Sequence, residues 1–116
     1  MDNTVFKKLN QIAKEMERDV VKFTQKLIQT PSISGDEGAV ANLLLVEMEK
    51  LGYDDYFTDD QGNVIGIVNG TEDGPTIMYN SHMDHVDPGN PENWEGYHPY
   101  GGKIDICEVD NQDQTA

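Results

Sequence analysis

Cysteine is almost absent from this chain of 116 residues, which contains a single one, Cys107. One cysteine cannot form an intramolecular disulfide, and this scarcity favours a reducing compartment. Its neighbours Asp105, Glu108 and Asp110 are acidic and disfavour the thiolate that a nucleophile needs. We therefore expect Cys107 to be structural or incidental rather than catalytic.

Basic residues and long apolar runs are also scarce. The chain has 8 Lys and Arg against 22 Asp and Glu, a formal net charge of -14. Binding to nucleic acid or to an anionic membrane is not expected, because both need clustered cations. No apolar run suits a signal peptide or a membrane span. The sequence thus predicts a cytoplasmic chain of one domain at most, with a modest core.

Apolar residues spaced by four and three predict a long N-terminal helix with one apolar stripe facing the core, formed by Val5, Leu9, Ile12, Met16, Val20, Phe23 and Leu27. The pair Thr30-Pro31 should end it, since a residue before proline avoids the α region. Ser34 to Glu37 has the spacing of a capping box and predicts the start of a second helix. Gly52 is the expected C-cap of that helix.

Strand chemistry follows the second helix. Residues 53–58 and 64–68 flank a turn at 59–63, which favours an antiparallel pair, and the nearly all-apolar run 64–68 suits a central strand covered on both faces. Residues 76–84 predict a third strand. We expect an α/β fold in which two N-terminal helices pack on a mixed, mostly parallel sheet.

The third predicted strand carries His82 and Asp84 at its carboxyl end. Side chains alternate along a strand, so both should project to one side, about 7 Å apart along the chain. Ligands often bind outside this end of α/β sheets, which makes a metal site one interpretation, although this spacing alone is more often without a metal role. The alternative is an ordinary loop histidine beside a solvated aspartate. His85 should point the other way, so we expect packing or hydrogen bonding there rather than metal ligation; His98 has less support.

A segment rich in proline and glycine follows, with Trp94, Tyr97 and Tyr100 embedded in it. These aromatic side chains either pack the loop onto the domain or form a wall on the substrate side of the His82 end of the sheet. The first interpretation is favoured, and the second stays open.

Four motifs occur in a specific order: Pro31–Gly35 (PSISG), Gly62–Val64 (GNV), Ser81–Val86 (SHMDHV) and Trp94–Gly102 with its terminal PYGG. Together they resemble the dinuclear zinc amidohydrolases and peptidases related to acetylornithine deacetylase, succinyl-diaminopimelate desuccinylase and carboxypeptidase G. Among subgroups, the chain is most similar to hydrolases associated with selenium metabolism. The resemblance spans nearly the whole chain.

The resemblance implies that His82 is a zinc ligand and that Asp84 orients its imidazole, which agrees with the usual hydrogen bond between a ligating histidine and a carboxylate. It also implies two zinc ions, a bridging aspartate and a glutamate general base, which together activate water for attack on an amide. The family's next motif, G-R-G before the bridging aspartate, is not in this sequence. Asp110 and Asp113 do not match that motif.

One histidine cannot complete a catalytic zinc site, which needs about three protein ligands. The expectation is therefore that residues 1–116 are the N-terminal segment of a catalytic domain whose remaining half and lid domain are absent. The parent protein would hydrolyse an amide bond of a small acylated amino acid or peptide, and this chain alone would be inactive. The alternative is a non-catalytic acidic binding module that self-associates, most simply as a homodimer.

Overall fold

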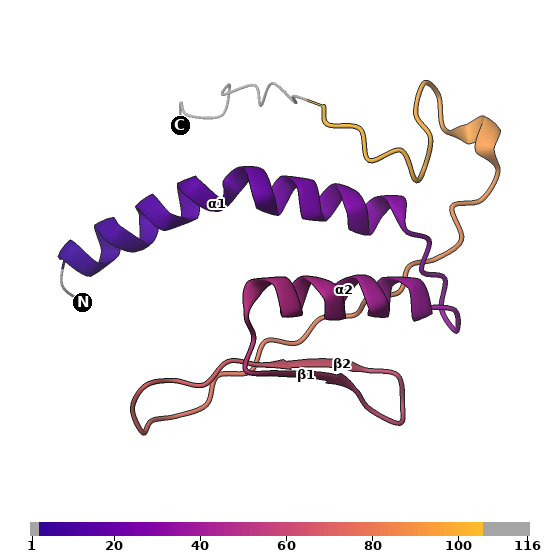
Figure 1. Cartoon of the computed structure of the whole chain (residues 1–116). Helices are drawn as coiled ribbons and strands as arrows, with labels where there is room; N and C mark the ends of the chain where they lie inside the picture. The colour runs from indigo at the N-terminus through magenta and orange to yellow at the C-terminus, as the bar shows by residue number, and fades with distance from the viewer. Residues whose placement is uncertain (1–2, 106–116) are drawn as a thin grey trace, which may run out of the picture.

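Two helices, a hairpin and a long irregular segment follow one another in the computed structural model, which describes residues 3–105 (Figure 1). Their order confirms the two predicted helices and the antiparallel pair. The bounds are α1 Asn3–Gln29, α2 Gly38–Leu51, β1 Asp55–Thr58, β2 Val64–Ile67 and the 3-10 turn η1 Pro91–Asn93. Figure 1 shows α1 above α2, the hairpin below α2, and the later chain returning past both helices.

Helix α1 ends as predicted, because Thr30 closes its last turn and Pro31 follows. The backbone N–H of Thr30 donates to the Leu27 carbonyl at 3.2 Å, and its hydroxyl donates to the Lys26 carbonyl at 2.7 Å. The stripe of seven apolar residues named above is called the α1 stripe from here on.

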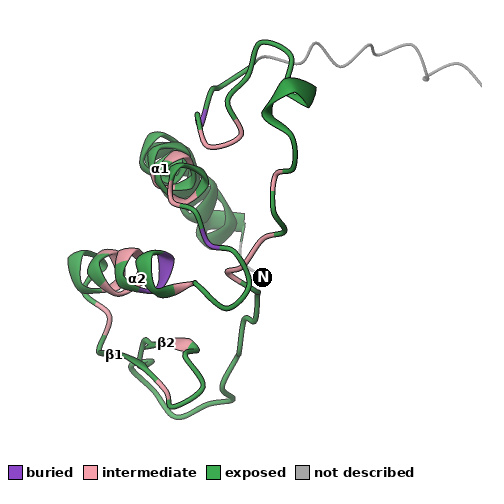
Figure 2. Ribbon diagram, turned by 90° about the vertical axis from the view of Figure 1, so that its right-hand side faces the viewer, coloured by how far each residue is buried: buried purple, intermediate pink, exposed green. Residues whose placement is uncertain are grey.

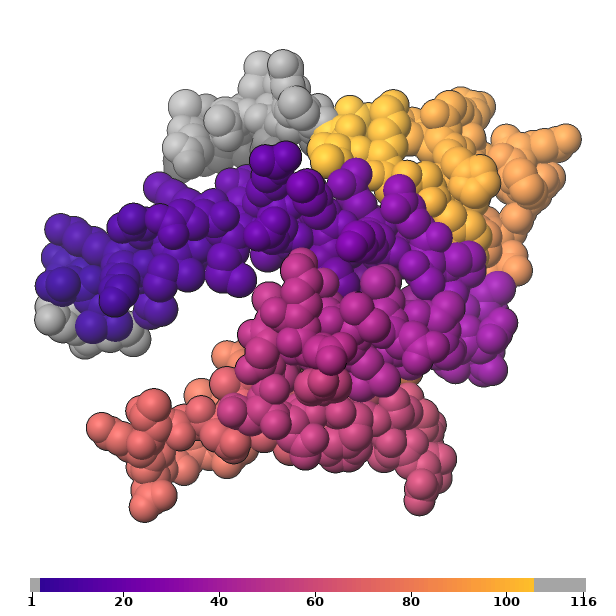
Figure 3. Space-filling view, in the orientation of Figure 1, coloured from indigo at the N-terminus to yellow at the C-terminus, as the bar shows by residue number. Residues whose placement is uncertain are grey.

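The prediction that the α1 stripe faces a core is wrong for the part of the chain that the structure describes. No residue of α1 is buried, and the first five members of the stripe are between 41% and 56% exposed. The N-terminal half of α1, drawn in indigo, projects beyond α2 (Figure 3). An amphipathic helix gains most of its stability from packing, so this face lacks the contacts that its pattern predicts.

Helix α2 begins at Gly38, and the predicted capping box does not form. Glu37 occupies the N-cap without a side-chain cap bond, and its carboxylate accepts a hydrogen bond from the Gly35 N–H at 2.6 Å. A turn closed by the Asp36 N–H and the Ile33 carbonyl at 2.8 Å precedes the helix, so Ser34 lies too early to cap it. The C-cap prediction is confirmed: Gly52 has φ +74° and donates to the Glu49 carbonyl.

The hairpin pairs β1 with β2 in antiparallel register, from Asp55 opposite Ile67 to Thr58 opposite Val64. Its turn is held by Asp59, whose Oδ1 accepts the Asn63 N–H and whose Oδ2 accepts the Asn63 side-chain amide, each at 2.9 Å. The side-chain bond from Asn63, with its backbone bond, lowers the pKa of Asp59 despite some opposing desolvation.

Helix α2 packs on this hairpin by placing Met48 over Gly66. A Cβ added at Gly66 would lie 2.7 Å from the Met48 sulfur, so glycine at this position makes room for the methionine. Among residues 3–105, the buried apolar side chains are those of Val40 and Ala41, at the start of α2, where Figure 2 shows a buried patch. Within residues 3–105, β2 pairs with β1 alone and is not covered on both faces. The mixed, mostly parallel sheet stays a prediction.

The strand predicted over residues 76–84 does not form within the described chain. Ile77, Met78 and Tyr79 are exposed, Tyr79 to 92%. A strand needs a partner for its backbone hydrogen bonds, and no described strand lies beside this segment. One parallel bridge, Ile33 with His85, joins its end to the loop between the helices.

Further along, the irregular segment docks on the C-terminal part of α1. The side-chain amides of Gln25 and Gln29 donate to the carbonyls of Gly102 and Gly101 at 2.7 and 3.1 Å. Gly102 is buried with φ +62°, and a Cβ there would lie 3.2 Å from the Gln29 side chain. The absence of a side chain thus allows this close approach.

Candidate functional site

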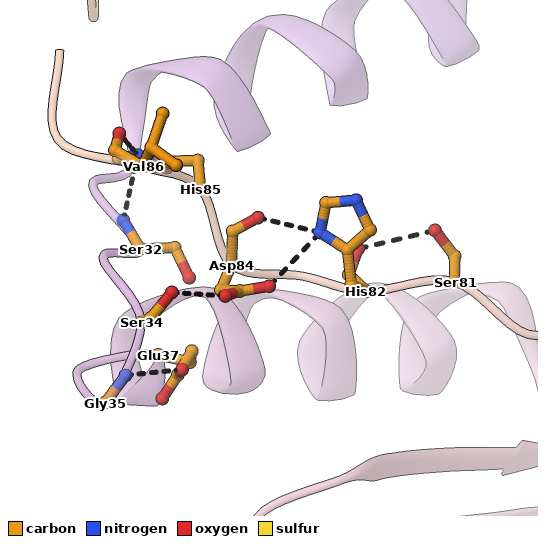
Figure 4. Close-up of polar contacts among 9 residues, drawn as sticks. All are labelled: Ser32, Ser34, Gly35, Glu37, Ser81, His82, Asp84, His85 and Val86. Carbon is orange, nitrogen blue, oxygen red and sulfur yellow. Dashed lines mark hydrogen bonds and ion pairs between the residues drawn. The ribbon is translucent and has the colours of Figure 1, made fainter.

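The candidate site lies where the loop 32–35, just before α2, meets residues 82–86 (Figure 4). Two backbone groups of Ser32 bind His85: the Ser32 N–H donates to the His85 Nε2, and the His85 N–H donates to the Ser32 carbonyl, both at 2.8 Å. Ser32 is 1% exposed and anchors the contact. This junction joins residues about 50 positions apart in the sequence.

The imidazole of His82 is held through one nitrogen. Its Nδ1 lies 2.9 Å from the backbone carbonyl oxygen of Asp84 and 3.1 Å from the Asp84 Oδ1. A carbonyl can only accept, so Nδ1 carries the proton and the lone pair of the neutral ring is on Nε2. The side chain is 82% exposed. In its neutral form, His82 would therefore turn the lone pair of Nε2, the atom that a metal ligand uses, away from Asp84.

The carboxylate of Asp84 lies between His82 and Ser34. Its Oδ1 faces His82, and its Oδ2 accepts a short hydrogen bond from the Ser34 hydroxyl (Figure 4). The bond from Ser34 is the largest influence on the pKa of Asp84 and lowers it; desolvation opposes this, and His82 lowers it further. The lowered pKa favours the charged carboxylate of Asp84, which is the better acceptor for a hydrogen bond from the His82 Nδ1–H.

His85 has neither ring nitrogen free. Its Nδ1 lies 2.8 Å from the Val86 carbonyl oxygen, which makes it the donor, and its Nε2 accepts the Ser32 N–H. Its ring also lies 5.5 Å from that of Tyr100. With its lone pair already engaged, His85 acts as a link between two loops, as its position after His82 led us to expect.

A complete metal site is not present in residues 3–105: no group of three or more His, Cys, Asp or Glu side chains comes together there. His82 is thus a single candidate ligand. His98 accepts the Tyr100 N–H at 3.2 Å and takes no part in the site. Cys107, Asp110 and Asp113 lie outside the described residues.

The aromatic residues of the loop contact their own segment. The Trp94 indole N–H donates to the Pro88 carbonyl at 2.9 Å. The Tyr97 hydroxyl bonds to the Asp105 carboxylate, which raises the pKa of Tyr97, and the Lys103 ammonium lies 4.2 Å from its ring centre. These contacts of Trp94 and Tyr97 lie within residues 88–105 and do not join the loop to the helices or the hairpin, so the favoured interpretation, that the aromatic residues pack the loop onto the domain, stays a prediction. A substrate-side role for them stays a prediction.

Ser34 belongs to this site, although its sequence spacing predicted a helix cap. The spacing Ser34 to Glu37 predicted a helix cap, whereas the hydroxyl binds Asp84, 50 residues away. The PSISG motif, which precedes the histidine motif in the resemblance, was the available signal that this loop and Asp84 belong together.

Neither helix in residues 3–105 combines the length and the apolar character needed to cross a bilayer.

Comparison with known proteins gives distant and partial relatives. The chain is 36% identical over 101 residues to Escherichia coli YgeY, a protein whose name assigns no activity; the match covers 86% of this chain and 24% of YgeY. It is 30% identical over 91 residues to the succinyl-diaminopimelate desuccinylase of Ehrlichia canis, covering 75% of this chain and 24% of the relative.

A third relative is named as a LysW-lysine and LysW-ornithine hydrolase of Pyrococcus furiosus, 38% identical over 66 residues, 57% of this chain and 19% of the relative. No family model matches the chain, and no solved structure matches it. The chain spans about a quarter of the length of YgeY and of the desuccinylase. The chain is therefore a distant homologue, over part of their length, of proteins named as a desuccinylase and as a hydrolase.

Proposed function

We propose that this chain is part of the catalytic domain of a zinc-dependent hydrolase that cleaves an amide bond of a small acylated amino acid or peptide. The observation that carries the proposal is the geometry of His82, whose Nδ1 is held by Asp84 and whose side chain is 82% exposed, so that Nε2 is left for a ligand. A carboxylate that accepts the N–H of one ring nitrogen leaves the other nitrogen of a histidine for the metal.

His82 would hold one zinc ion through Nε2, while Asp84 keeps the ring in the required tautomer. When bound, zinc polarises a carbonyl and makes water a better nucleophile at neutral pH. The other zinc ligands would come from residues outside 3–105, because no group of three or more His, Cys, Asp or Glu side chains forms within them. The resemblance implies that the general base also lies outside these residues. On this proposal the chain of 116 residues alone hydrolyses nothing.

The substrate class rests on the relatives. One relative is named as a succinyl-diaminopimelate desuccinylase and another as a LysW-lysine and LysW-ornithine hydrolase, and these names support an acylated amino acid as the substrate. The irregular segment 88–102, which carries Trp94, Tyr97 and Tyr100, begins two residues after Val86. It is the described part of the chain best placed to contact a substrate near His82. A cytoplasmic location is part of the same proposal.

The test uses the protein made from the complete reading frame of the gene. We expect that frame to continue past Ala116 into G-R-G and a bridging aspartate, and the purified protein to hydrolyse succinylated or acetylated amino acids. His82→Ala should abolish hydrolysis. Asp84→Asn should reduce it by about 10–100-fold, the usual loss when the hydrogen-bond partner of a metal-ligating histidine is removed. His98→Ala, outside the site, is the control.

A stop codon directly after Ala116, or full activity of His82→Ala, would contradict this function. In the first case the second candidate takes the lead.

The second candidate is self-association through the α1 stripe, favoured by its exposure. Its spacing is symmetric about Met16, so antiparallel pairing with a second copy would place apolar residues against apolar residues. The net charge of -14 opposes association, so salt should strengthen it. Sedimentation should show a dimer at high salt that Met16→Glu abolishes and Val46→Glu, at an exposed position of α2, does not. A monomer at every salt concentration removes this candidate.

A further inference from the structure

We propose that Ser34 is a positioning residue of this site, whose hydroxyl fixes the carboxylate of Asp84 and through it the imidazole of His82. The inference rests on the proposed function, because it concerns the orientation of the candidate zinc ligand. It adds a third member to the pair, contributed by the loop before α2 rather than by the segment that carries His82.

The geometry of Asp84 carries the argument. A carboxylate with one partner can still turn about its terminal torsion, which is broad. Asp84 has a partner on each oxygen, the Ser34 hydroxyl on Oδ2 and the His82 Nδ1 on Oδ1. Opposite partners on the two oxygens fix the plane of the carboxylate. Since His82 is 82% exposed, few other contacts restrain its ring.

Ser34 is itself held on both sides. Before it, Ser32 is buried and exchanges two hydrogen bonds with His85. After it, Gly35 has φ +92°, a conformation that favours glycine, and its N–H donates to the Glu37 carboxylate at 2.6 Å. The loop is therefore tied to the histidine segment at one end and to α2 at the other. This allows it to present the hydroxyl to Asp84 at little entropic cost.

The role of Ser34 can be separated from helix capping. Helix α2 begins at Gly38, its N-cap is Glu37, and no side chain caps it. Removing the Ser34 hydroxyl therefore removes no cap. Ser81 is a matched control, because it lies beside His82 and its exposed hydroxyl bonds only to the His82 carbonyl, at 3.3 Å, among the described contacts.

The experiment is long-range ¹⁵N NMR of the histidine rings in the metal-free chain, at a pH where His82 is neutral. Wild type should show His82 mainly as the Nδ1–H tautomer. Ser34→Ala should shift it to a mixture of tautomers, Ser34→Thr should restore the wild-type spectrum, and Ser81→Ala should leave it unchanged. Amide signals of the hairpin, such as Gly66, report whether the fold is intact. If Ser34→Ala alters the hairpin signals, Ser34→Cys takes its place as the test variant, because cysteine is similar in size to serine and its thiol is only a weak donor. The same shift to a mixture of His82 tautomers is expected.

An unchanged His82 tautomer in Ser34→Ala, or an equal change in Ser81→Ala, would overturn the proposal. This outcome is distinguishable from failure of the proposed function, because the measurement involves neither zinc nor substrate. The same variants extend the test in the protein from the complete reading frame. Zinc affinity should fall about 10-fold in Ser34→Ala, the lower end of the loss seen when a group that orients a metal ligand is removed. It should recover in Ser34→Thr. Equal zinc affinity in Ser34→Ala and wild type would also contradict it.

Discussion

The unit formed by α2 and the hairpin differs sharply from the irregular segment 69–105. In the first, neighbours in sequence are neighbours in space: β1 pairs with β2 across a five-residue turn, and Met48 of α2 covers Gly66. In the second, the side-chain hydrogen bonds that join residues 84–102 to α1 and to the loop between the helices reach back 50 to 77 positions, from Asp84 to Ser34 and from Gly102 to Gln25. The candidate site belongs to the second kind.

This difference teaches where function can be placed in such a chain. Local contacts build a scaffold whose register is fixed by its own sequence, whereas the site is assembled by a few distant contacts between loops. Such sites depend on the scaffold but are more easily altered without unfolding it. The four predictions below act on the two regions separately.

The largest effect is expected from a charge in the small core of the first region. Val40 is 3% exposed, so Val40→Asp should cost about 3 kcal/mol or more, the range for an unpaired buried charge. Val46→Asp, on the same helix at 61% exposure, should change stability little. Urea unfolding followed by circular dichroism measures both. Equal stability of the two variants would show that the start of α2 is not a core position.

A smaller effect is expected at the end of α2. Gly52 has φ +74°, so Gly52→Ala should destabilise by about 1–2 kcal/mol, the cost of a left-handed residue with a Cβ. Gly38→Ala, at the first residue of α2 without positive φ or a close neighbour, should be neutral or slightly stabilising. The same unfolding measurement applies. If both variants behave alike, the left-handed C-cap is not present in solution.

The second region should respond to Gly102→Ala without loss of the first. A Cβ at Gly102 meets the Gln29 side chain at 3.2 Å, and φ is +62°, so we expect about 1–2 kcal/mol of local undocking. The side-chain amide signals of Gln25 and Gln29 should move toward solvent-exposed positions in NMR spectra, while the hairpin signals stay. Gly74→Ala, in open space, is the control. Unchanged glutamine signals would contradict the docking.

The smallest effect compares two aspartates, one in each region. Both have a lowered pKa, Asp59 mainly through Asn63, four residues away, and Asp84 mainly through Ser34, 50 residues away. Asn63→Ala should raise the pKa of Asp59 alone, and Ser34→Ala that of Asp84 alone. Carboxyl ¹³C titration measures both. A shift of both pKa values in either variant would show that the regions are coupled.

The sign of the pH dependence follows from these directions. Each carboxylate has a folded-state pKa below its unfolded value, so its contribution to stability is complete above the unfolded pKa. That contribution is lost as the pH falls through the folded pKa. Wild type should therefore lose stability on acidification, and each variant should lose less.

Prediction from sequence succeeded where the determinant is local. The end of α1 at Thr30-Pro31, the C-cap at Gly52 and the hairpin turn depend on residues within a few positions of one another. It failed for Ser34, because a hydroxyl can satisfy either a nearby helix end or a distant carboxylate, and spacing alone reports the first. The strand expected at 76–84 needs a partner strand, which its own pattern cannot supply.

For the site, alternation along a strand does not apply, because residues 76–84 form no strand in the described chain. The two histidines differ instead in their hydrogen bonds: both ring nitrogens of His85 are engaged, whereas the His82 side chain is 82% exposed. The roles of His82 as a zinc ligand and of Asp84 as its orienting carboxylate stay predictions. For the α1 stripe, the spacing of apolar residues predicts an apolar face of the helix but not which part of the protein, or which partner, covers that face.

The most direct test of the central claim is a crystal structure of the protein from the complete reading frame, with anomalous diffraction data collected at the zinc edge. The account predicts an anomalous peak about 2.0–2.1 Å from the Nε2 of His82, the usual zinc–nitrogen distance, with Nδ1 still facing Asp84. A zinc-loaded crystal without a peak at His82, or with zinc on its Nδ1, would contradict it.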